Sequence, residues 1–328
     1  MRLPEKEKGW LMTSYIIRRM CISLLTVFII SVFAFSIMHI LPGDPVKIAL
    51  GEGATQEMID EYRAKLYLDR PIIEQYFIWI RNILLHGDYG TSIMYEENVG
   101  SLMREKLPVT LSIGIPTVIL SVIFGLFFGI LSAVKRGSWI DQVVTFIANL
   151  GIATPQFWIA IMGILVFGKA LKILPIQGYT APGVDFIDYL HKGLMPIVFG
   201  SLGFIATITR QTRSNMLEVI NQDYVRTARA NGLKEKRVIY RHALKNALIP
   251  VVTIIGLQVR VIVGGSVVIE RIFNIPGIGQ LLMRAISNRD YLIVQACVMV
   301  ISLVTVASNF IVDLAYGIID PQIRKNWE

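Results

Sequence analysis

Long uncharged stretches rich in apolar residues alternate with short charged segments along this chain of 328 residues. A helix needs about 17–25 residues to cross a hydrocarbon core of about 30 Å. Six stretches meet or approach that length: Met20–Ile40, Val109–Val134, Gln142–Phe167, Leu194–Thr209, Ala247–Ile269 and Tyr291–Ile318. The fourth is the weakest, because Lys192 and Arg210 flank it closely. The pattern predicts an all-α membrane protein with six transmembrane helices, the first of them an uncleaved anchor.

The basic residues indicate the orientation of these helices. If the N-terminus is cytoplasmic and the spans alternate, the cytoplasmic pieces 1–19, 135–141, 210–246 and 319–328 hold 18 Lys and Arg against 8 Asp and Glu. The longer outside pieces hold 13 against 15. Cytoplasmic loops of membrane proteins carry such an excess of cations. Both termini are therefore predicted to be cytoplasmic, and the net charge of +8 reflects topology rather than nucleic-acid binding.

The predicted spans divide the chain into four parts. Residues 1–40 form the cytoplasmic N-terminus with the first span, and residues 41–108 an extracytoplasmic helical segment. Residues 109–318 form a five-helix core that contains the cytoplasmic loop 210–246, and residues 319–328 a cytoplasmic tail. The first span is expected at the edge of this core.

The extracytoplasmic segment carries two amphipathic helical patterns, each too short to span a membrane. After the helix-breaking LPGDP, Thr55 is a candidate N-cap. The first pattern places Met58, Ile59, Tyr62 and Leu66 on one face, and the second Ile73, Tyr76, Phe77, Ile80 and Leu84. Such helices are expected on the outer surface of the bundle or in the lipid headgroup zone. Two interpretations remain open, a cover for the bundle and a docking platform for an external partner.

Small residues recur at every fourth position of the second span, at Ser121, Gly125, Gly129 and Ala133. This stripe allows a neighbouring helix to approach closely, and packing within the chain is favoured over a contact between subunits. Pro116, Pro155 and the pair Gly264–Gly265 are expected to weaken helices at membrane depth, where neighbours or a water-lined cavity can satisfy the freed backbone groups.

The chain offers no readable catalytic or metal site. Cys21 and Cys297 lie in separate apolar spans and the four histidines are scattered, so neither a disulfide nor a metal-ligand set is indicated. The stretch GILVFGKA lacks the hydroxyl residue of the phosphate loop GxxxxGKS/T and lies in an apolar span. We therefore expect no enzyme activity and no cofactor in this chain, with any nucleotide energy supplied by a partner.

One polar helical pair interrupts the apolar pattern, DYVRTARANGLKEKRVIYRHALKNALIP at residues 223–250. Its two short helices meet at Gly232, but a segment tethered at both ends to membrane spans has no third helix to complete a DNA-binding unit. The segment resembles the cytoplasmic EAA loop of binding-protein-dependent ABC permeases, with RTA at the EAA position followed by the glycine of the pattern. Arg226 replaces the acidic residue of the general pattern, and His242 and Lys245 replace its later Ile and Pro.

Further motifs extend the resemblance over nearly the whole chain, to the peptide and nickel branch of that superfamily: LPGDP, LDRPIIEQYFIWI, GDYGTS, KRGSWID, GGSVVIERIFNIPGIGQLL, RDYLIVQA and VDLAYGIIDPQIR. The resemblance implies a type I ABC importer permease fold in the cell membrane of a prokaryote. It also implies partners, namely a second homologous permease, two cytoplasmic ATPase subunits that bind ATP and Mg, and an external solute-binding protein. The long segment near the N-terminus favours the first-type permease subunit.

The resemblance further implies the import of di- or oligopeptides. Chelated nickel and glutathione-like cargo fit the same branch, and an ion-driven secondary transporter is the alternative from another class. No carboxylate relay at mid-membrane is evident in the sequence to support that alternative.

On this hypothesis the segment from Tyr224 to Leu233 is the coupling helix that contacts an ATPase. Its assigned residues are Tyr224, Arg226, Thr227, Ala228, Arg229, Ala230, Gly232 and Leu233. The small residues allow close entry into a cleft, and Gly232 allows a sharp exit from the helix. Arg226, Arg229 and Lys234 are expected to supply cations to an acidic rim on the ATPase.

A second set of residues is assigned to the substrate pathway and outer gate: Arg260, Gly264, Gly265, Glu270 and Pro276. Arg260 stands at membrane depth, where a charge costs at least about 2.5–3.5 kcal/mol and usually faces a cavity or a partner. It either attracts a substrate carboxylate or pairs with the partner permease. Asp313, near the inner end of the sixth span, is expected to fix that end of the bundle.

Overall fold

The structure is a computed structural model that describes residues 5–40, 44–51, 53–92 and 94–319. These residues form helices and the segments that connect them, with one isolated bridge between Thr91 and Asn98. The helices are α1 (Glu5–Ile40), α2 (Pro45–Leu50), α3 (Gln56–Lys65), α4 (Ile72–His86), α5 (Val99–Val134), α6 (Trp139–Ala153), α7 (Gln156–Gly163), α8 (Phe186–Ile220), α9 (Asp223–Ala230), α10 (Glu235–Arg237), α11 (Leu244–Ile272), α12 (Ile278–Ser287) and α13 (Tyr291–Ile319), with π-helical segments η1 (Ile164–Ala170) and η2 (Val238–Ala243). The predicted tail 319–328 lies, apart from Ile319, outside the described residues.

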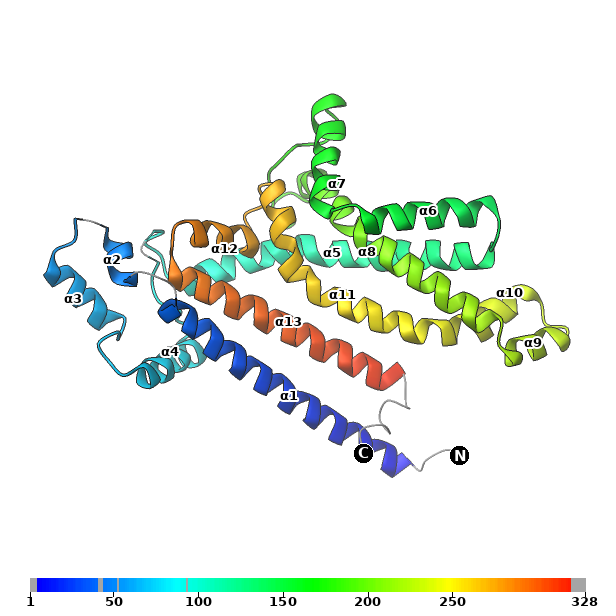
Figure 1. The fold of residues 1–328 in the computed structure, drawn as a ribbon, viewed down its shortest axis with the longest axis horizontal. Helices are drawn as coiled ribbons and strands as arrows, with labels where there is room; N and C mark the ends of the chain where they lie inside the picture. Colours follow the sequence, from blue (N-terminus) through cyan, green and yellow to red (C-terminus); the bar gives the residue numbers. More distant parts are fainter. Residues whose placement is uncertain (1–4, 41–43, 52, 93, 320–328) are drawn as a thin grey trace.

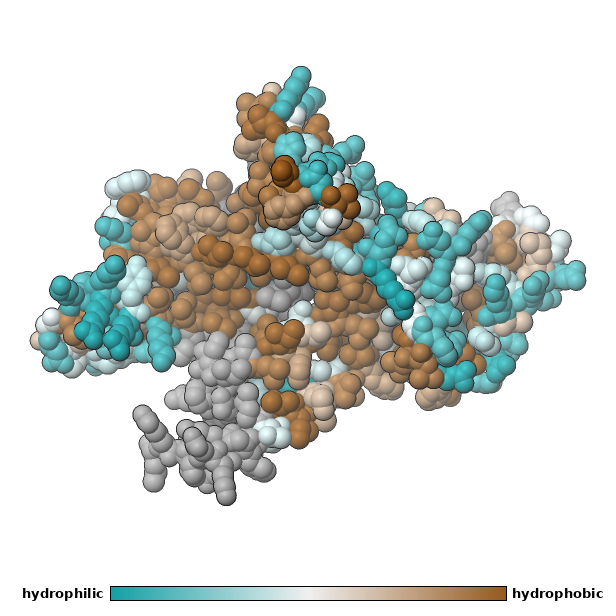
Figure 2. Space-filling view, turned by 180° about the vertical axis from the view of Figure 1, so that it is seen from behind, coloured by the Kyte–Doolittle hydropathy of each residue, from teal (hydrophilic) through white to brown (hydrophobic). Residues whose placement is uncertain are grey.

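The long helices run side by side along the longest axis of the molecule (Figure 1). The short helices α2, α3 and α4 gather at one end, which we call the outer end, and α9 and α10 at the opposite, inner end. The beginning of α1 and the end of α13 both lie toward the inner end. On the face drawn in Figure 2, hydrophobic residues cover much of the middle of the bundle, and hydrophilic residues gather at both ends and on the protruding limb. This distribution fits a membrane protein with the predicted alternating topology.

Within the part of the chain that the structure describes, four helices contain an unbroken apolar stretch long enough to cross a membrane: α1 within Thr13–Ile40, α5, α8, and α13 within Tyr291–Leu314. Two further apolar stretches are bent, Trp139–Ala153 with Gln156–Ala170 by 105°, and Glu235–Leu248 with Pro250–Gln258 by 52°. When each bent pair counts as one span, the described residues hold up to six candidate spans, the number that the sequence predicts, although the second bent pair begins at Glu235 and the predicted fifth span at Ala247.

The span predicted over Gln142–Phe167 is broken at its expected weak point, Pro155. α6 ends at Ala153 and α7 begins at Gln156. Thr154 has an extended backbone, as residues before proline prefer, and Pro155 has no N–H with which to continue the α6 hydrogen bonds. The expected weak point is therefore a complete break, and α7 leaves the bundle as the upper limb in Figure 1.

The fourth predicted span, Leu194–Thr209, is only the middle of α8, which has 35 residues. Of the two charges that flank the predicted span, Lys192 is paired in the structure, and so is Arg213, three residues beyond Arg210. Lys192 lies 2.6 Å from the Asp188 carboxylate, and Arg213 lies 2.7 Å from the Asp141 carboxylate. The predicted span stops at the first charged residue on each side, because a hydropathy scale treats every charged side chain as unpaired. The helix itself continues beyond these residues.

α5 and α8 approach closely through the predicted stripe of small residues. A Cβ on Gly125 would lie 2.6 Å from the Cβ of Ile208, and one on Gly129 would lie 2.5 Å from the Cβ of Thr212. The hydroxyl of Thr209 also donates to the carbonyl oxygen of Gly125 at 3.3 Å. The stripe therefore serves packing within the chain, as expected.

Gly129→Ala is expected to destabilise the protein by about 1–3 kcal/mol, because the added methyl group overlaps Thr212. Gly203→Ala is the matched control on α8, where an added Cβ meets no atom within 4 Å. That change is expected to gain up to about 1 kcal/mol from helix propensity. Thermal unfolding in detergent measures both variants, and equal stabilities would contradict the close packing.

α1 lies at the edge of the bundle, as expected, where it packs against α13 (Figure 1). Toward the inner end, the guanidinium of Arg19 lies 2.8 Å from the Asp313 carboxylate. The Tyr15 hydroxyl donates to the carbonyl oxygen of Asp313, also at 2.8 Å. Asp313 therefore fixes the inner ends of two helices together, which confirms its predicted role.

α5 begins at Val99, so residues 99–108 of the predicted outer segment form the first turns of that helix. Thr55 caps α3 as predicted, with its hydroxyl accepting a backbone N–H at 3.4 Å. Asp44 caps α2 and pairs with Arg63 of α3. Burial alone would raise the pKa of Asp44, but the hydrogen bonds from Arg63 and from a backbone N–H lower it overall. This pair joins α2 to α3.

The two amphipathic helices of this segment differ from prediction in the faces that they bury. On α3, Ile59 is buried, whereas Met58 is exposed. On α4, Tyr76 packs toward α1, whereas Phe77 and Leu84 are exposed. Residues assigned to one face by the sequence thus lie on two.

Candidate functional site

The polar segment after α8 folds back on itself at the inner end of the bundle (Figure 1). Its first helix, α9, buries one face, formed by Val225 and Ala228, whose three-residue spacing places them side by side. The buried cluster contains Val225, Ala228, Val238 and Ala243, with Val219, Ile220 and Leu233 partly buried against it. Because these residues come from α8, α9 and η2, packing as well as chain connection attaches α9 to the end of α8.

The opposite face of α9 is exposed. It carries Tyr224, Arg226, Thr227 and Ala230. The Tyr224 hydroxyl accepts a hydrogen bond from the side-chain amide of Asn246 at 2.8 Å, and the Thr227 hydroxyl donates to the backbone of its own helix. Arg226 is 71% exposed, and its contact with the solvated Asp223 carboxylate is long, at 3.7 Å. The face therefore presents short or tethered side chains and one projecting cation, a shape that can enter a shallow cleft closely.

The helix predicted to extend from Tyr224 to Leu233 is shorter in the structure, because α9 ends at Ala230. The N–H of Gly232 closes the helix end on the carbonyl oxygen of Arg229 at 2.9 Å. Gly232 has φ of +75°, a region that glycine adopts readily and other residues rarely. An added Cβ would meet no atom within 4 Å, so the glycine supplies a backbone conformation rather than space. The turn that it makes returns Leu233 to the buried cluster.

Arg229 is engaged within the loop. Its Nη2 lies 2.8 Å from one oxygen of Glu235, and its Nε lies 3.1 Å from the other. These hydrogen bonds raise the pKa of Arg229, so the pair remains charged at neutral pH. The pairing counts against Arg229 as a cation for a partner surface, and joins α9 to α10 instead. Arg226 and Lys234 remain exposed.

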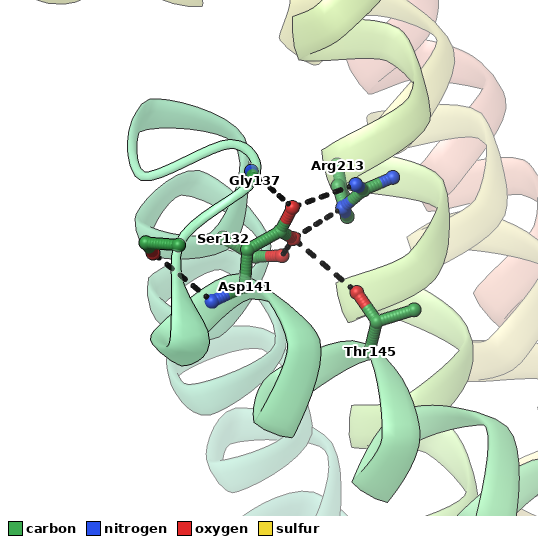
Figure 3. Close-up of polar contacts among 6 residues, drawn as sticks. Ser132, Gly137, Asp141, Thr145 and Arg213 are labelled. Carbon is green, nitrogen blue, oxygen red and sulfur yellow. Dashed lines mark hydrogen bonds and ion pairs between the residues drawn. The ribbon is translucent and has the colours of Figure 1, made fainter.

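A buried carboxylate ties three helices together near the inner end of α8 (Figure 3). Asp141, in the first turn of α6, accepts hydrogen bonds from Nε and Nη2 of Arg213 at 2.7 and 2.9 Å. The hydroxyls of Ser132 and Thr145 and the N–H of Gly137 also donate to it. Asp141 is only 4% exposed, and these bonds replace the water that its charge has lost. We name Ser132, Gly137, Asp141, Thr145 and Arg213 the inner clamp.

The inner clamp lies close to α9 along the chain. Arg213 precedes Ile220, the last residue of α8, by about two helical turns. The sequence contains one local sign of the clamp, Ser138, which caps α6 three residues before Asp141. No pattern links Asp141 to Arg213, 72 positions later, so the pair is found only in the structure.

Two of the predicted gate residues, Glu270 and Pro276, lie where α11 turns into α12 at the outer end of the bundle. Glu270 is fully buried and accepts hydrogen bonds from the Thr110 hydroxyl at 2.8 Å and from the N–H of Gln280 at 3.0 Å. The Thr110 hydroxyl also accepts from the N–H of Ile278 at 2.9 Å. These bonds hold the turn between α11 and α12, which contains Pro276, against α5. Their part in gating stays a prediction.

The other predicted pathway residues lie within α11. The helix continues through Gly264 and Gly265, so the expected weakening does not interrupt it. The side chain of Arg260 lies outside the described part of the structure, and its two alternative roles stay predictions. Among the described residues, no group of three His, Cys, Asp or Glu side chains is placed to hold a metal ion.

Comparison with known families defines the class of protein. Residues 125–325 match the binding-protein-dependent transport system inner membrane component, and residues 12–114 match the N-terminal part of such a membrane component. The chain therefore belongs to this family of transport permeases, and the resemblance seen in its sequence is confirmed. A permease of this family works with an ATPase and a substrate-binding component.

Its relatives carry more particular names. A putative peptide transport system permease protein of Brucella melitensis is 38% identical over 96% of this chain and 99% of that protein. The oligopeptide transport system permease AppB of Bacillus subtilis is also 38% identical, over 95% of this chain and 100% of that protein. Among solved structures, an inward-facing conformation of the MetNI methionine ABC transporter aligns with 64% of this chain and 94% of that chain, at 20% identity and a TM-score of 0.49.

Proposed function

We propose that this chain is a permease subunit of an ATP-driven importer of di- or oligopeptides. The observation that carries the proposal is the position of α9 at the predicted cytoplasmic end of the bundle. Its exposed face presents short or tethered side chains and one projecting cation, Arg226. The peptide cargo rests on the names of the relatives, which are peptide and oligopeptide transport permeases.

In this proposal the chain pairs with a second homologous permease in the cell membrane of a prokaryote. Two cytoplasmic ATPase subunits bind ATP and Mg, so that this chain needs no cofactor, and an external binding protein delivers the peptide. The exposed face of α9 docks on one ATPase, where Arg226 meets an acidic side chain.

Movement of the ATPase reaches the membrane through packed helices. The buried cluster around Val225 fixes α9 on α8, and the inner clamp fixes α8 to α5 and α6. Displacement of α9 therefore carries three helices as one body. Because packed interiors resist continuous deformation, little of the movement is lost in the loop.

Uptake by the assembled transporter tests this function. Vesicles that contain the chain, the second permease and the ATPases are expected to accumulate labelled di- or oligopeptide when ATP and the binding protein are supplied on their proper sides. A proton or sodium gradient without ATP is expected to give no uptake. Nickel chelate and glutathione serve as competing cargoes in the same assay. Gradient-driven uptake would contradict the importer class, and ATP-driven uptake of only these other cargoes would overturn the peptide assignment.

A further inference from the structure

α4 is apolar on two sides, and α1 covers one of them. On the covered side the Tyr76 hydroxyl lies 2.7 Å from that of Ser31, and the Tyr76 ring packs edge-on against Phe28 with centroids 6.4 Å apart. The ring of Trp79 lies 5.8 Å from that of Phe35. α4 is thereby fixed against the outer part of α1, as Figure 1 shows.

These contacts set the depth of α4. The apolar span of α1, Thr13–Ile40, has 28 residues and is about 42 Å long at 1.5 Å per residue. A hydrocarbon core about 30 Å thick, centred on this span, ends near Ser36. Phe28, Ser31 and Phe35 all lie inside that limit. Their contacts therefore place α4 at the depth of the outer acyl chains rather than above the membrane.

The uncovered side of α4 is strongly apolar. Ile73, Phe77 and Leu84 are 74%, 63% and 75% exposed, and their spacings of four and seven residues align them in one strip. The charged residues Glu74 and Arg81 lie on a neighbouring strip, about 70° away around the helix axis at 100° per residue. An apolar strip beside a charged strip is typical of a helix that lies in a membrane interface.

We propose that α4 is an interfacial helix whose Ile73, Phe77 and Leu84 side chains lie among the outer acyl chains of the lipid bilayer. Glu74 and Arg81 lie at the level of the lipid headgroups, with the arginine stem reaching over apolar surface. A water-soluble partner does not fit this face, because it would have to enter the hydrocarbon to reach it. α4 thus anchors the outer segment in the bilayer and holds α2 and α3 at the membrane surface.

Spin labels on single cysteines test this placement in the assembled transporter, with Cys21 and Cys297 replaced by serine. The labels are introduced by Phe77→Cys and Leu84→Cys in vesicles of phosphatidylethanolamine and phosphatidylglycerol. Collision rates with oxygen, which concentrates in lipid, are compared with those of a water-soluble nickel chelate. Phe33→Cys, on the exposed apolar face of α1, is the lipid reference, and Glu61→Cys, on the exposed face of α3, is the water reference.

The ratio of oxygen to nickel collisions at Phe77 and Leu84 is expected to match that at Phe33 and to exceed that at Glu61 several-fold. Adding the external binding protein is expected to leave it unchanged. A ratio equal to that at Glu61 would place the strip in water and overturn the proposal. Loss of both collision rates only when the binding protein is added would overturn it too, by showing a protein-docking surface.

Discussion

Gly232→Val is expected to abolish ATP-driven uptake while the protein remains inserted and assembled with its ATPases. At a φ of +75° a β-branched side chain costs about 1–2 kcal/mol or more, so the turn relaxes toward negative φ. Leu233 then leaves the buried cluster, and the end of α9 changes direction relative to α8. Parallel assays of ATP hydrolysis and peptide uptake in vesicles measure the effect, with hydrolysis expected to persist and uptake to be lost.

Gly51→Val provides a matched control for this change. Gly51 has φ of +81° and, like Gly232, no atom within 4 Å of an added Cβ, but it follows α2 at the outer end. A valine at positive φ is therefore introduced far from α9, and uptake is expected to remain close to normal. Gly232→Asn should also retain much of the uptake, because asparagine tolerates positive φ. Unaltered uptake by Gly232→Val would show that this turn does not couple the two activities.

The second large effect is expected at the inner clamp. Asp141→Ala leaves the guanidinium of Arg213 without its carboxylate in a largely buried position, and is expected to destabilise the protein by about 3 kcal/mol. Uptake is expected to fall as well, since α8 is no longer fixed to α5 and α6. Thermal unfolding and uptake by the assembled transporter measure the two effects. The double variant Asp141→Leu with Arg213→Met removes both charges and is expected to recover much of the lost stability.

The control for the clamp lies on the outer half of α8. Asp188→Ala breaks the ion pair with Lys192, in which both side chains are about one-third exposed, so water can replace the lost partner. A clearly smaller loss of stability is expected there. Equal losses at Asp141 and Asp188 would mean that burial and the additional hydrogen bonds of the clamp contribute nothing.

Features that depend on local sequence were largely predictable. Apolar length defined the six spans, the distribution of Lys and Arg gave them an orientation, and the stripe at Gly125 and Gly129 indicated a close helix contact. The loop around Gly232 was also recognisable, because a run of helix formers, a glycine and a second polar helix are adjacent in the chain.

Features that depend on distant partners were not predictable. Asp141 and Arg213 find each other only after α5, α6 and α8 have packed, so neither residue alone indicated the pair. The second apolar side of α4 was assigned to the same face as Tyr76, because a helical pattern shows which residues are apolar but not which neighbour covers them. At Pro155 the sequence showed a weak point, but the angle of the break depends on the helices around it.

The most direct test of the account is the accessibility of the exposed face of α9. Arg226→Cys, in a chain with Cys21 and Cys297 replaced by serine, is treated with a membrane-impermeant maleimide from either side of the membrane, with and without the ATPase subunits. The account predicts labelling from the cytoplasmic side alone and protection when the ATPases are bound, while Glu61→Cys is labelled from outside in both states. Labelling of Arg226→Cys from outside, or full reactivity in the complex with bound ATPases, would contradict it.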